Sequence, residues 1–335
     1  MTVQAQPPAS SAVGQAGAPS AGRVPDFFIV GHPKCGTTAL HQMLRRHPQI
    51  HMPLKEPRFF AQELRSRFRR LGPERLPLTL EQYLALFAAA APEQRAGEAS
   101  PQYLRSEHAA ARIAEVQPQA RVIAILREPA SFLRSLHLQF LRTNVETEKD
   151  MRKAIELEPR RRAGEALPRN STRVKAVLYS EHVRYAEQLR RYHAVFAPEQ
   201  VLVLIYEDFR DDNEQTVRKV WRFLGLDDSV PIDTVEVNPA VSLRSPRLYE
   251  MARAVYMGRD PGARAVKRVI KGLTPQRVRH DALGVQTRVQ RSGTPPPPDE
   301  ELMLELRRRF KDEVSAISEY LDRDLVSLWG YDRLD

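Results

Sequence analysis

Three short apolar runs are the clearest recurring pattern along the chain. They cover Phe27–Val30, Val122–Leu126 and Val201–Ile205, and polar residues bound each of them. Continuous apolar runs of this length are typical of strands that are buried on both faces of a parallel sheet. A weaker strand candidate covers Arg95–Ser100.

Segments with apolar residues at helical spacing alternate with these runs. They cover residues 37–47, 78–91, 131–141, 185–196, 213–226 and 299–321. This alternation predicts an α/β fold with a central, mostly parallel sheet flanked by helices. Ligands of such sheets bind beyond the carboxyl ends of the strands, where the loop after Gly31 and the residue Arg127 would both lie.

The ends of the chain differ in composition from its middle. Residues 1–23 are rich in Ala, Pro, Ser, Gly and Gln, which predicts a disordered tail, and residues 24–335 are expected to form one domain. The proline run within residues 291–300 predicts a rigid connector. The tail lacks the features of a secretory signal, and no apolar run reaches the roughly 18 residues of a membrane span, so we expect a cytoplasmic protein.

Composition and charge narrow the function only slightly. Of 335 residues, 42% are hydrophobic, enough for a substantial core. Lys and Arg number 52 against 42 Asp and Glu, a net charge of +10 that suits an anionic ligand, nucleic acid or an anionic membrane surface. No nucleic-acid-binding motif accompanies the charge, so we expect no nucleic-acid partner. The single cysteine, Cys35, favours a reducing compartment.

The sequence GHPKCGTTAL, which begins at Gly31, follows the first apolar run. A glycine turn between a strand and a helix presents backbone N–H groups and a positive helix end to a phosphate. In nucleoside-triphosphate loops a lysine follows the second glycine, and the next hydroxyl holds Mg²⁺. Here Thr37 occupies the lysine position and Lys34 lies inside the loop, where it suits a leaving 5′-phosphate. The alternative is a simple glycine turn without a ligand.

A second candidate phosphate-binding element follows the second apolar run. In ILREPASFLRS, Arg127 comes directly after the predicted strand and Ser135 follows eight residues later. A guanidinium fork and a hydroxyl match a phosphate monoester. The alternative is an arginine at the sheet edge and a serine on a helix surface.

These two elements resemble those of sulfotransferases that use 3′-phosphoadenosine 5′-phosphosulfate (PAPS). PKCGTTAL is similar to their 5′-phosphosulfate loop, and Arg127 with Ser135 is similar to their 3′-phosphate element. Weaker resemblances, including KEPRFF and GEASPQYL, extend from about Asp26 to Trp329. The pattern resembles the branch that contains glycosaminoglycan sulfotransferases and their bacterial relatives. The resemblance implies a P-loop-like three-layer fold and PAPS as sulfuryl donor, without a metal.

The resemblance also implies roles for individual residues. Glu56, ahead of the double phenylalanine in KEPRFF, would be the catalytic base, and Lys34 would neutralise charge on the departing 5′-phosphate; His32 or Glu98 would be the next candidates for the base. Alternatively, Glu56 only pairs with Lys55, Arg58 or another cation. The residues expected to bind the donor are Lys34, Cys35, Gly36, Thr37, Thr38, Arg127, Ser135 and Arg291.

Other features carry weaker hypotheses. His32, His41, His47 and His51 lie near the loop, but their spacing favours structural histidines over a metal site. Cys35 is either a thiol activated by the helix end or a small residue that fills the turn. The basic segment 244–291 is either a membrane-surface or acceptor-binding face, or a solvated helix face.

The leading functional hypothesis is therefore sulfuryl transfer from PAPS to a hydroxyl or amine of a carbohydrate, lipid or natural-product acceptor. A P-loop kinase using ATP and Mg²⁺ is the enzymatic alternative. A nucleotide-binding or membrane-surface module without catalysis is the other. The sequence names neither the acceptor nor the oligomeric state.

Overall fold

A five-stranded parallel sheet forms the centre of the protein, and its strand order is β2-β3-β1-β4-β5. The computed structural model describes residues 22–53, 55–64, 76–143, 145–168, 174–232 and 296–334. The strands are β1 (Phe27–Gly31), β2 (Ile50–His51), β3 (Arg95–Ala99), β4 (Arg121–Leu126) and β5 (Val201–Ile205).

The burial of the strands explains why they read as continuous apolar runs. All five residues of β1 are buried, and so are the last five of β4, because helices cover both faces of the sheet. The three predicted strands and the weaker candidate at Arg95–Ser100 are confirmed as β1, β4, β5 and β3. The two-residue strand β2 was not predicted, since so short a segment shows no periodicity.

Helices separate the strands, as predicted. Their bounds are α1 (Thr37–Leu44), α2 (Leu80–Leu84), α3 (Ala109–Val116), α4 (Pro129–Thr143), α5 (Met151–Glu156), α6 (Glu158–Arg162), α7 (Tyr185–His193), α8 (Tyr206–Asp211), α9 (Asn213–Leu224), α13 (Glu300–Arg309), α14 (Lys311–Tyr320) and α15 (Leu325–Leu328). Short 3₁₀ turns are η1 (Gln62–Leu64), η2 (Ala85–Phe87), η3 (Val174–Val177), η4 (Tyr179–Val183) and η5 (Pro198–Gln200).

Two predicted helices differ from the observed ones. The segment 78–91 forms the short helix α2 followed by the 3₁₀ turn η2. The segment 299–321 is not one helix, because it breaks at Phe310, whose backbone has φ −104° and ψ 13°. The buried side chain of Phe310 anchors this break in the core.

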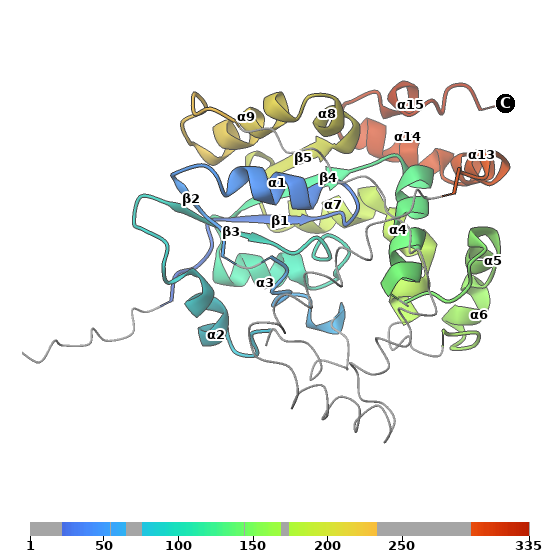
Figure 1. Ribbon diagram of the computed structural model, residues 1–335, viewed down its shortest axis with the longest axis horizontal. Helices are drawn as coiled ribbons and strands as arrows, with labels where there is room; N and C mark the ends of the chain where they lie inside the picture. The colour runs from blue at the N-terminus through green and yellow to red at the C-terminus, as the bar shows by residue number, and fades with distance from the viewer. Residues whose placement is uncertain are drawn as a thin grey trace, which may run out of the picture.

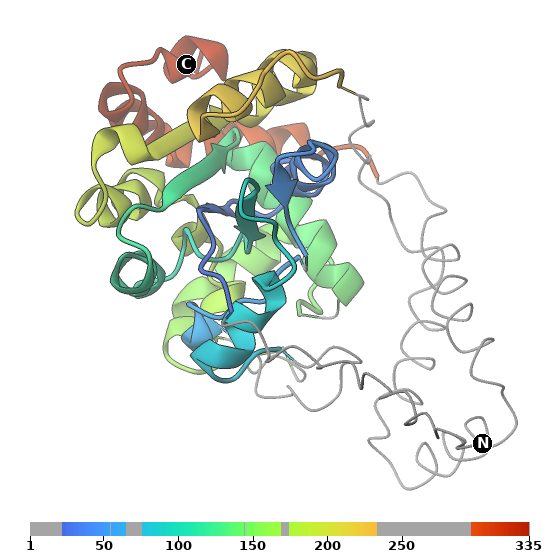
Figure 2. The same cartoon turned by 90° about the vertical axis from the view of Figure 1, so that its left-hand side faces the viewer.

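The helices form layers on the two faces of the sheet (Figures 1 and 2). Helices α1 and α9 pack together on one face, whereas α3 and α7 lie on the other. This arrangement confirms the predicted three-layer α/β fold. Because β1, β4 and β5 are parallel, the segments that follow them meet at one edge of the sheet.

Some sequence-based predictions lie outside the described residues. Arg291, the basic segment 244–291 and residues 1–21 of the predicted tail are among them. Arg23, the last residue of that tail, is described, and its guanidinium donates to the carbonyl oxygens of Ala91 and Gln94. Within the described ranges, no helix is both long enough and apolar enough to cross a bilayer.

Candidate active site

The loop between β1 and α1 depends on a glycine at its end. Gly36 precedes the first residue of α1 and has a φ of 78°, in the left-handed region. A Cβ atom at Gly36 would lie 2.8 Å from two ring carbons of Phe209 on α8. Any other residue would therefore combine backbone strain with a steric clash.

Lys34 is a partly buried cation inside this loop. Burial is the main cause that lowers its pKa to about 8, and the nearby charges of Arg142 and Arg127 lower it further. Three cations thus converge where the helix end also presents a positive potential. An anionic ligand bound here would offset the repulsion among these three cations. The sequence-based prediction that Lys34 binds a phosphate group is consistent with this environment.

The other loop residues have different environments. The hydroxyl of Thr38 accepts a hydrogen bond of 2.7 Å from Lys55 Nζ. The side chains of Thr37 and Cys35 are buried. Burial raises the pKa of the Cys35 thiol, which favours the interpretation of Cys35 as a small residue that fills the turn over a reactive thiolate.

Arg127 meets the loop from the end of β4. Its Nη1 donates to the carbonyl oxygen of Lys34 at 3.1 Å, and its guanidinium lies 4.4 Å from the centre of the Tyr206 ring. Its Nε is buried and has no hydrogen-bond partner. Ser135 lies on α4 and is 8% exposed. The structure therefore brings Arg127 to the loop and leaves a donor atom of its guanidinium unsatisfied.

Two residues near Arg127 and Lys34 were not predicted from the sequence. Tyr206, the first residue after β5, stacks on the Arg127 guanidinium. Arg142, in the last turn of α4, is close enough to lower the pKa of Lys34. The position of Tyr206 directly after an apolar run was a usable signal, because the end of β5 lies beside the end of β4.

Glu56 belongs to a segment that one backbone hydrogen bond and two bonds to side-chain hydroxyls tether to β3 and the turn after it. Glu56 N donates to Ala99 O at 2.8 Å. The next two tethers end on hydroxyl groups, since Arg58 N donates to Ser100 Oγ at 3.0 Å and Phe60 N to Tyr103 Oη at 3.2 Å. These bonds hold two residues with positive φ, Glu56 at 65° and Arg58 at 52°. Left-handed conformations are costly for non-glycine residues and persist where surrounding contacts enforce them.

The Glu56 carboxylate is in contact with cations. Its Oε2 accepts from Arg58 Nε at 3.1 Å and from Arg58 Nη2, and its Oε1 lies 3.5 Å from Lys55 Nζ. Burial by itself would raise the pKa of Glu56, but Arg58 and Lys55 together lower it below the usual value. The ion pairs that the sequence suggested as an alternative role for Glu56 are thus present.

Lys55 connects Glu56 to the loop. Its Nζ is 2.7 Å from Thr38 Oγ1 at the start of α1 and 3.5 Å from Glu56 Oε1. The carboxylate therefore lies one side chain away from the helix end that faces the proposed phosphate.

The other candidate bases are enclosed in the core. His32 is buried, its Nε2 lies 2.6 Å from Gln188 Oε1, and burial lowers its pKa to about 3. Glu98 is also buried, and its Oε2 accepts from the hydroxyls of Tyr83 at 2.6 Å and Tyr103 at 3.1 Å. Neither residue has the solvent access that Glu56 has.

The carboxylates directly after β5 have structural partners. Among the described residues, no cluster of His, Cys, Asp and Glu could hold a metal ion. Glu207 accepts a hydrogen bond of 3.0 Å from Trp329 Nε1, and Asp208 pairs with Arg323 through two contacts of 2.7 Å. A P-loop kinase would hold Mg²⁺ with a carboxylate near the end of such a strand, and both carboxylates here have other partners.

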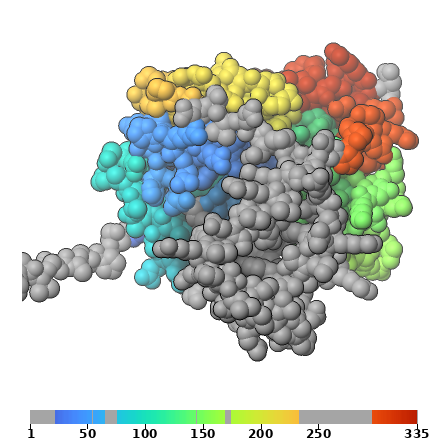
Figure 3. Space-filling view, viewed as in Figure 1, coloured from blue at the N-terminus to red at the C-terminus, as the bar shows by residue number. Residues whose placement is uncertain are grey.

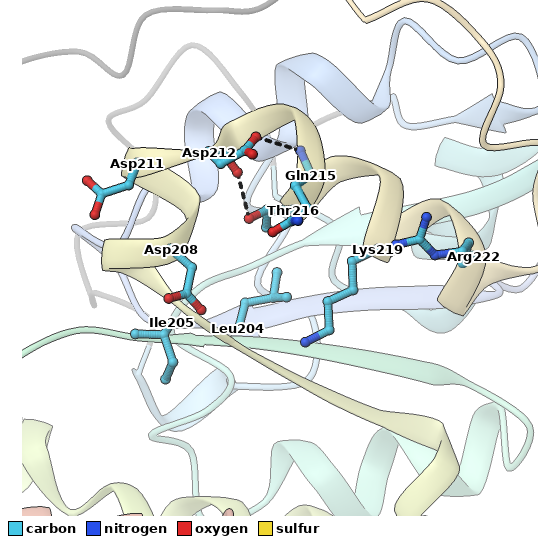
Figure 4. Close-up of a pocket in the computed structure, with 9 residues that line it drawn as sticks. All are labelled: Leu204, Ile205, Asp208, Asp211, Asp212, Gln215, Thr216, Lys219 and Arg222. Carbon is cyan, nitrogen blue, oxygen red and sulfur yellow. Dashed lines mark hydrogen bonds between the residues drawn. The ribbon is translucent and has the colours of Figure 1, made fainter. Parts of the chain in front are cut away.

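A separate pocket of about 350 Å³ lies over β5 (Figure 4). Leu204 and Ile205 lie at its base, and Asp208 on α8 and Lys219 on α9 are on its walls. None of the predicted donor residues or Glu56 lines this pocket.

Comparisons with known proteins identify the family of this chain. A model described as "Sulfotransferase family" matches residues 25–229. Carbohydrate sulfotransferase 15 of Mus musculus is 29% identical over 250 residues, covering 61% of this chain and 44% of the relative. Heparan sulfate glucosamine 3-O-sulfotransferase 3A1 of Mus musculus is 28% identical over 206 residues, covering 61% of this chain and 46% of the relative.

A solved structure has a similar fold over most of the chain. The crystal structure of a sulfotransferase from Alicyclobacillus acidocaldarius superposes with a TM-score of 0.64 and 26% identity, covering 91% of this chain and 98% of that protein. By contrast, the chain spans less than half the length of the two curated relatives.

Proposed function

Because this chain belongs to the sulfotransferase family, we propose that it transfers a sulfuryl group from PAPS to a hydroxyl or amine group of an acceptor. The acceptor classes are a carbohydrate, a lipid or a natural product. Two of the relatives are named for carbohydrate and heparan sulfate substrates, so carbohydrates are the first acceptor class to screen.

The buried, unpartnered Nε of Arg127 is the observation that carries this proposal. A buried guanidinium donor without a partner is costly unless a ligand satisfies it. It lies beside a glycine loop whose lysine is partly buried, so two anionic groups of one ligand can be bound together. PAPS carries such groups, a 3′-phosphate for Arg127 and Ser135 and a 5′-phosphosulfate for Lys34 and the loop.

The proposed reaction assigns one task to each group. The acceptor oxygen or nitrogen attacks sulfur in line with the bond from sulfur to the 5′-phosphate oxygen, and that bond breaks. The acceptor's proton passes to the Glu56 carboxylate, acting as general base. Lys34 stabilises the negative charge that develops on the departing 5′-phosphate oxygen. The products are the sulfated acceptor and 3′,5′-diphosphoadenosine.

The ion pair between Glu56 and Arg58 is compatible with this role. The pair keeps Glu56 ionised at neutral pH, and only the ionised form accepts a proton. Both side chains remain partly exposed, at 30% for Glu56 and 26% for Arg58, so an acceptor can reach them. Arg58 would release at least one carboxylate oxygen when the acceptor binds.

The kinase alternative fits the loop less well. In a kinase loop the hydroxyl corresponding to Thr38 holds Mg²⁺. Here that hydroxyl accepts a hydrogen bond from the Lys55 ammonium, which repels a cation. The neighbouring carboxylates Glu207 and Asp208 are engaged by Trp329 and Arg323.

Ligand binding tests the two hypotheses directly. We expect 3′,5′-diphosphoadenosine to raise the melting temperature without added metal, since a ligand that binds only the native state stabilises it. Stabilisation by ATP with Mg²⁺ but not by the diphosphate would support the kinase. Arg127→Ala should weaken the diphosphate much more than adenosine 5′-monophosphate, and equal losses would refute its assignment. A screen of acceptor classes with radiolabelled PAPS would then identify the substrate.

A further inference from the structure

Glu207 is a buried carboxylate next to the arginine of the proposed 3′-phosphate site. It directly follows Tyr206, whose ring stacks on Arg127. Burial raises the pKa of Glu207, although the hydrogen bond from Trp329 and the Arg127 charge act in the opposite direction. A carboxylate and a guanidinium at such a site commonly form a bidentate pair.

The contacts of the Glu207 carboxylate are with other groups than Arg127. Its Oε2 accepts the indole N–H of Trp329 at 3.0 Å, and its Oε1 lies 3.5 Å from the backbone nitrogen of Glu128. Arg127 donates through Nη1 to Lys34 O and keeps a buried Nε without a partner. The guanidinium therefore remains available although a carboxylate is nearby.

The C-terminal segment that carries Trp329 is anchored on both sides of this residue. Arg323 forms two hydrogen bonds of 2.7 Å with Asp208 on α8. Tyr331 donates a hydrogen bond of 2.7 Å to Oε1 of Glu128, the residue that directly follows Arg127. In the space-filling view, the red C-terminal residues adjoin the yellow region of α8 (Figure 3). Trp329 is thus held at a fixed place beside the ends of β4 and β5.

We propose that Trp329 is a positioning residue of the donor site, which holds Glu207 away from Arg127 and so keeps the guanidinium for the ligand's 3′-phosphate. This inference rests on the proposed function. Without the indole N–H, the Glu207 carboxylate turns to the unsatisfied guanidinium and competes with the phosphate. The loss falls on the 3′-phosphate alone, because Lys34 and the loop are unchanged.

The test compares the affinities for 3′,5′-diphosphoadenosine and adenosine 5′-monophosphate by calorimetry. Trp329→Phe removes the N–H and retains an aromatic ring, and it should reduce the preference for the diphosphate by about tenfold, the worth of one hydrogen bond to a charged group. Adding Glu207→Gln should restore the preference, because a neutral amide competes poorly with phosphate.

The other tryptophan of the chain is a matched control. Trp221 is also buried, but its Nε1 has no hydrogen-bond partner. Trp221→Phe should therefore leave the preference unchanged. Reduced preference in Trp329→Phe alone, with recovery in the double variant, supports the inference. An unchanged preference, or a loss that Glu207→Gln does not reverse, overturns it.

Two further results separate the inference from its premise. Glu207→Gln alone should preserve the preference, and this holds even if Trp329→Phe proves unstable; a loss would show that the carboxylate itself orients Arg127 and would overturn the inference. If the wild-type protein shows no preference for the diphosphate, the proposed function fails first and the inference fails with it.

Discussion

The two sides of the candidate site are built by different means. On the proposed donor side, the loop after β1 and Arg127 after β4 begin directly at the ends of buried strands, and the loop has positive φ at Lys34 and Gly36. On the acceptor side, the segment 55–60 has positive φ at Glu56 and Arg58, and hydroxyl groups of Ser100 and Tyr103 receive its N–H groups.

The two sides differ in what holds their residues rather than in backbone strain, because each side includes a non-glycine residue with positive φ. On the donor side, the glycine turn and the strand ends place backbone N–H groups together with the side chains of Lys34 and Arg127. The acceptor side holds its carboxylate through individual side-chain contacts in a costly conformation, as is common where a catalytic group must be aimed. Substitutions on the donor side should therefore affect ligand binding, and those on the acceptor side should affect turnover.

Glu56→Gln should have the largest effect of these substitutions, and it should separate turnover from ligand affinity most clearly. We expect turnover to fall by about 100-fold or more, the usual worth of a general base, while affinity for 3′,5′-diphosphoadenosine is retained. Lys34→Ala should damage both quantities. Steady-state kinetics on the acceptor found by the screen, together with calorimetry, measures this difference. Near-normal turnover by Glu56→Gln would place the base elsewhere.

Gly36→Ala should destabilise the donor side strongly. The left-handed conformation costs a non-glycine residue roughly 1–2 kcal/mol, and the new Cβ would also lie 2.8 Å from the Phe209 ring. Gly164 is a matched control, since its φ is 83° and no atom lies within 4 Å of a Cβ added there. Urea denaturation should show a clearly larger loss for Gly36→Ala than for Gly164→Ala. Equal losses of stability in the two variants would mean that the Phe209 ring moves aside at little cost.

The pH dependence of nucleotide binding should reveal Lys34. Its lowered pKa of about 8 means that it is charged below pH 8 and becomes neutral above it. Anion binding needs the charged form, so affinity for the diphosphate should fall by up to about tenfold per pH unit above pH 8, each pKa unit being 1.36 kcal/mol. Lys34→Arg should remove this decline, because arginine stays charged. Calorimetry between pH 7 and 9.5 avoids the phosphate titration near pH 6.

Ser100→Ala should produce the smallest effect, on the acceptor side only. It removes the acceptor of the Arg58 N–H, which should cost about 1 kcal/mol of stability and reduce turnover severalfold without changing diphosphate affinity. Ser100→Thr keeps the hydroxyl and should recover turnover.

Ser106→Ala is the control for that experiment. Ser106 is equally buried, and its hydroxyl accepts the backbone N–H groups of His108 and Ala109 and donates to the Glu63 carboxylate. Ser106→Ala should lose at least as much stability as Ser100→Ala and keep turnover. If both serine variants lose turnover to the same degree, Ser100 has no special relation to Glu56.

The sequence by itself predicted four of the five strands and indicated the residues proposed for the donor side of the site. Each buried strand is a local apolar run, and the glycine turn and Arg127 follow such runs directly, so their meeting at one edge follows from parallel strands. The short elements were missed because their stability is not local. Helix α6 (Glu158–Arg162) is mostly charged, and a buried pair of 2.7 Å between Arg161 and Glu146 anchors it.

Only the tertiary structure decided how the side chains of the site are held. Arg58 and Ser100 are 42 residues apart, and Glu207 and Trp329 are 122 residues apart. The sequence indicated Glu56 by its motif. It did not indicate the hydroxyl groups that hold the segment around Glu56, or the indole N–H that donates a hydrogen bond to Glu207. Such contacts form between single polar groups brought together by packing, and no periodicity or local spacing encodes them.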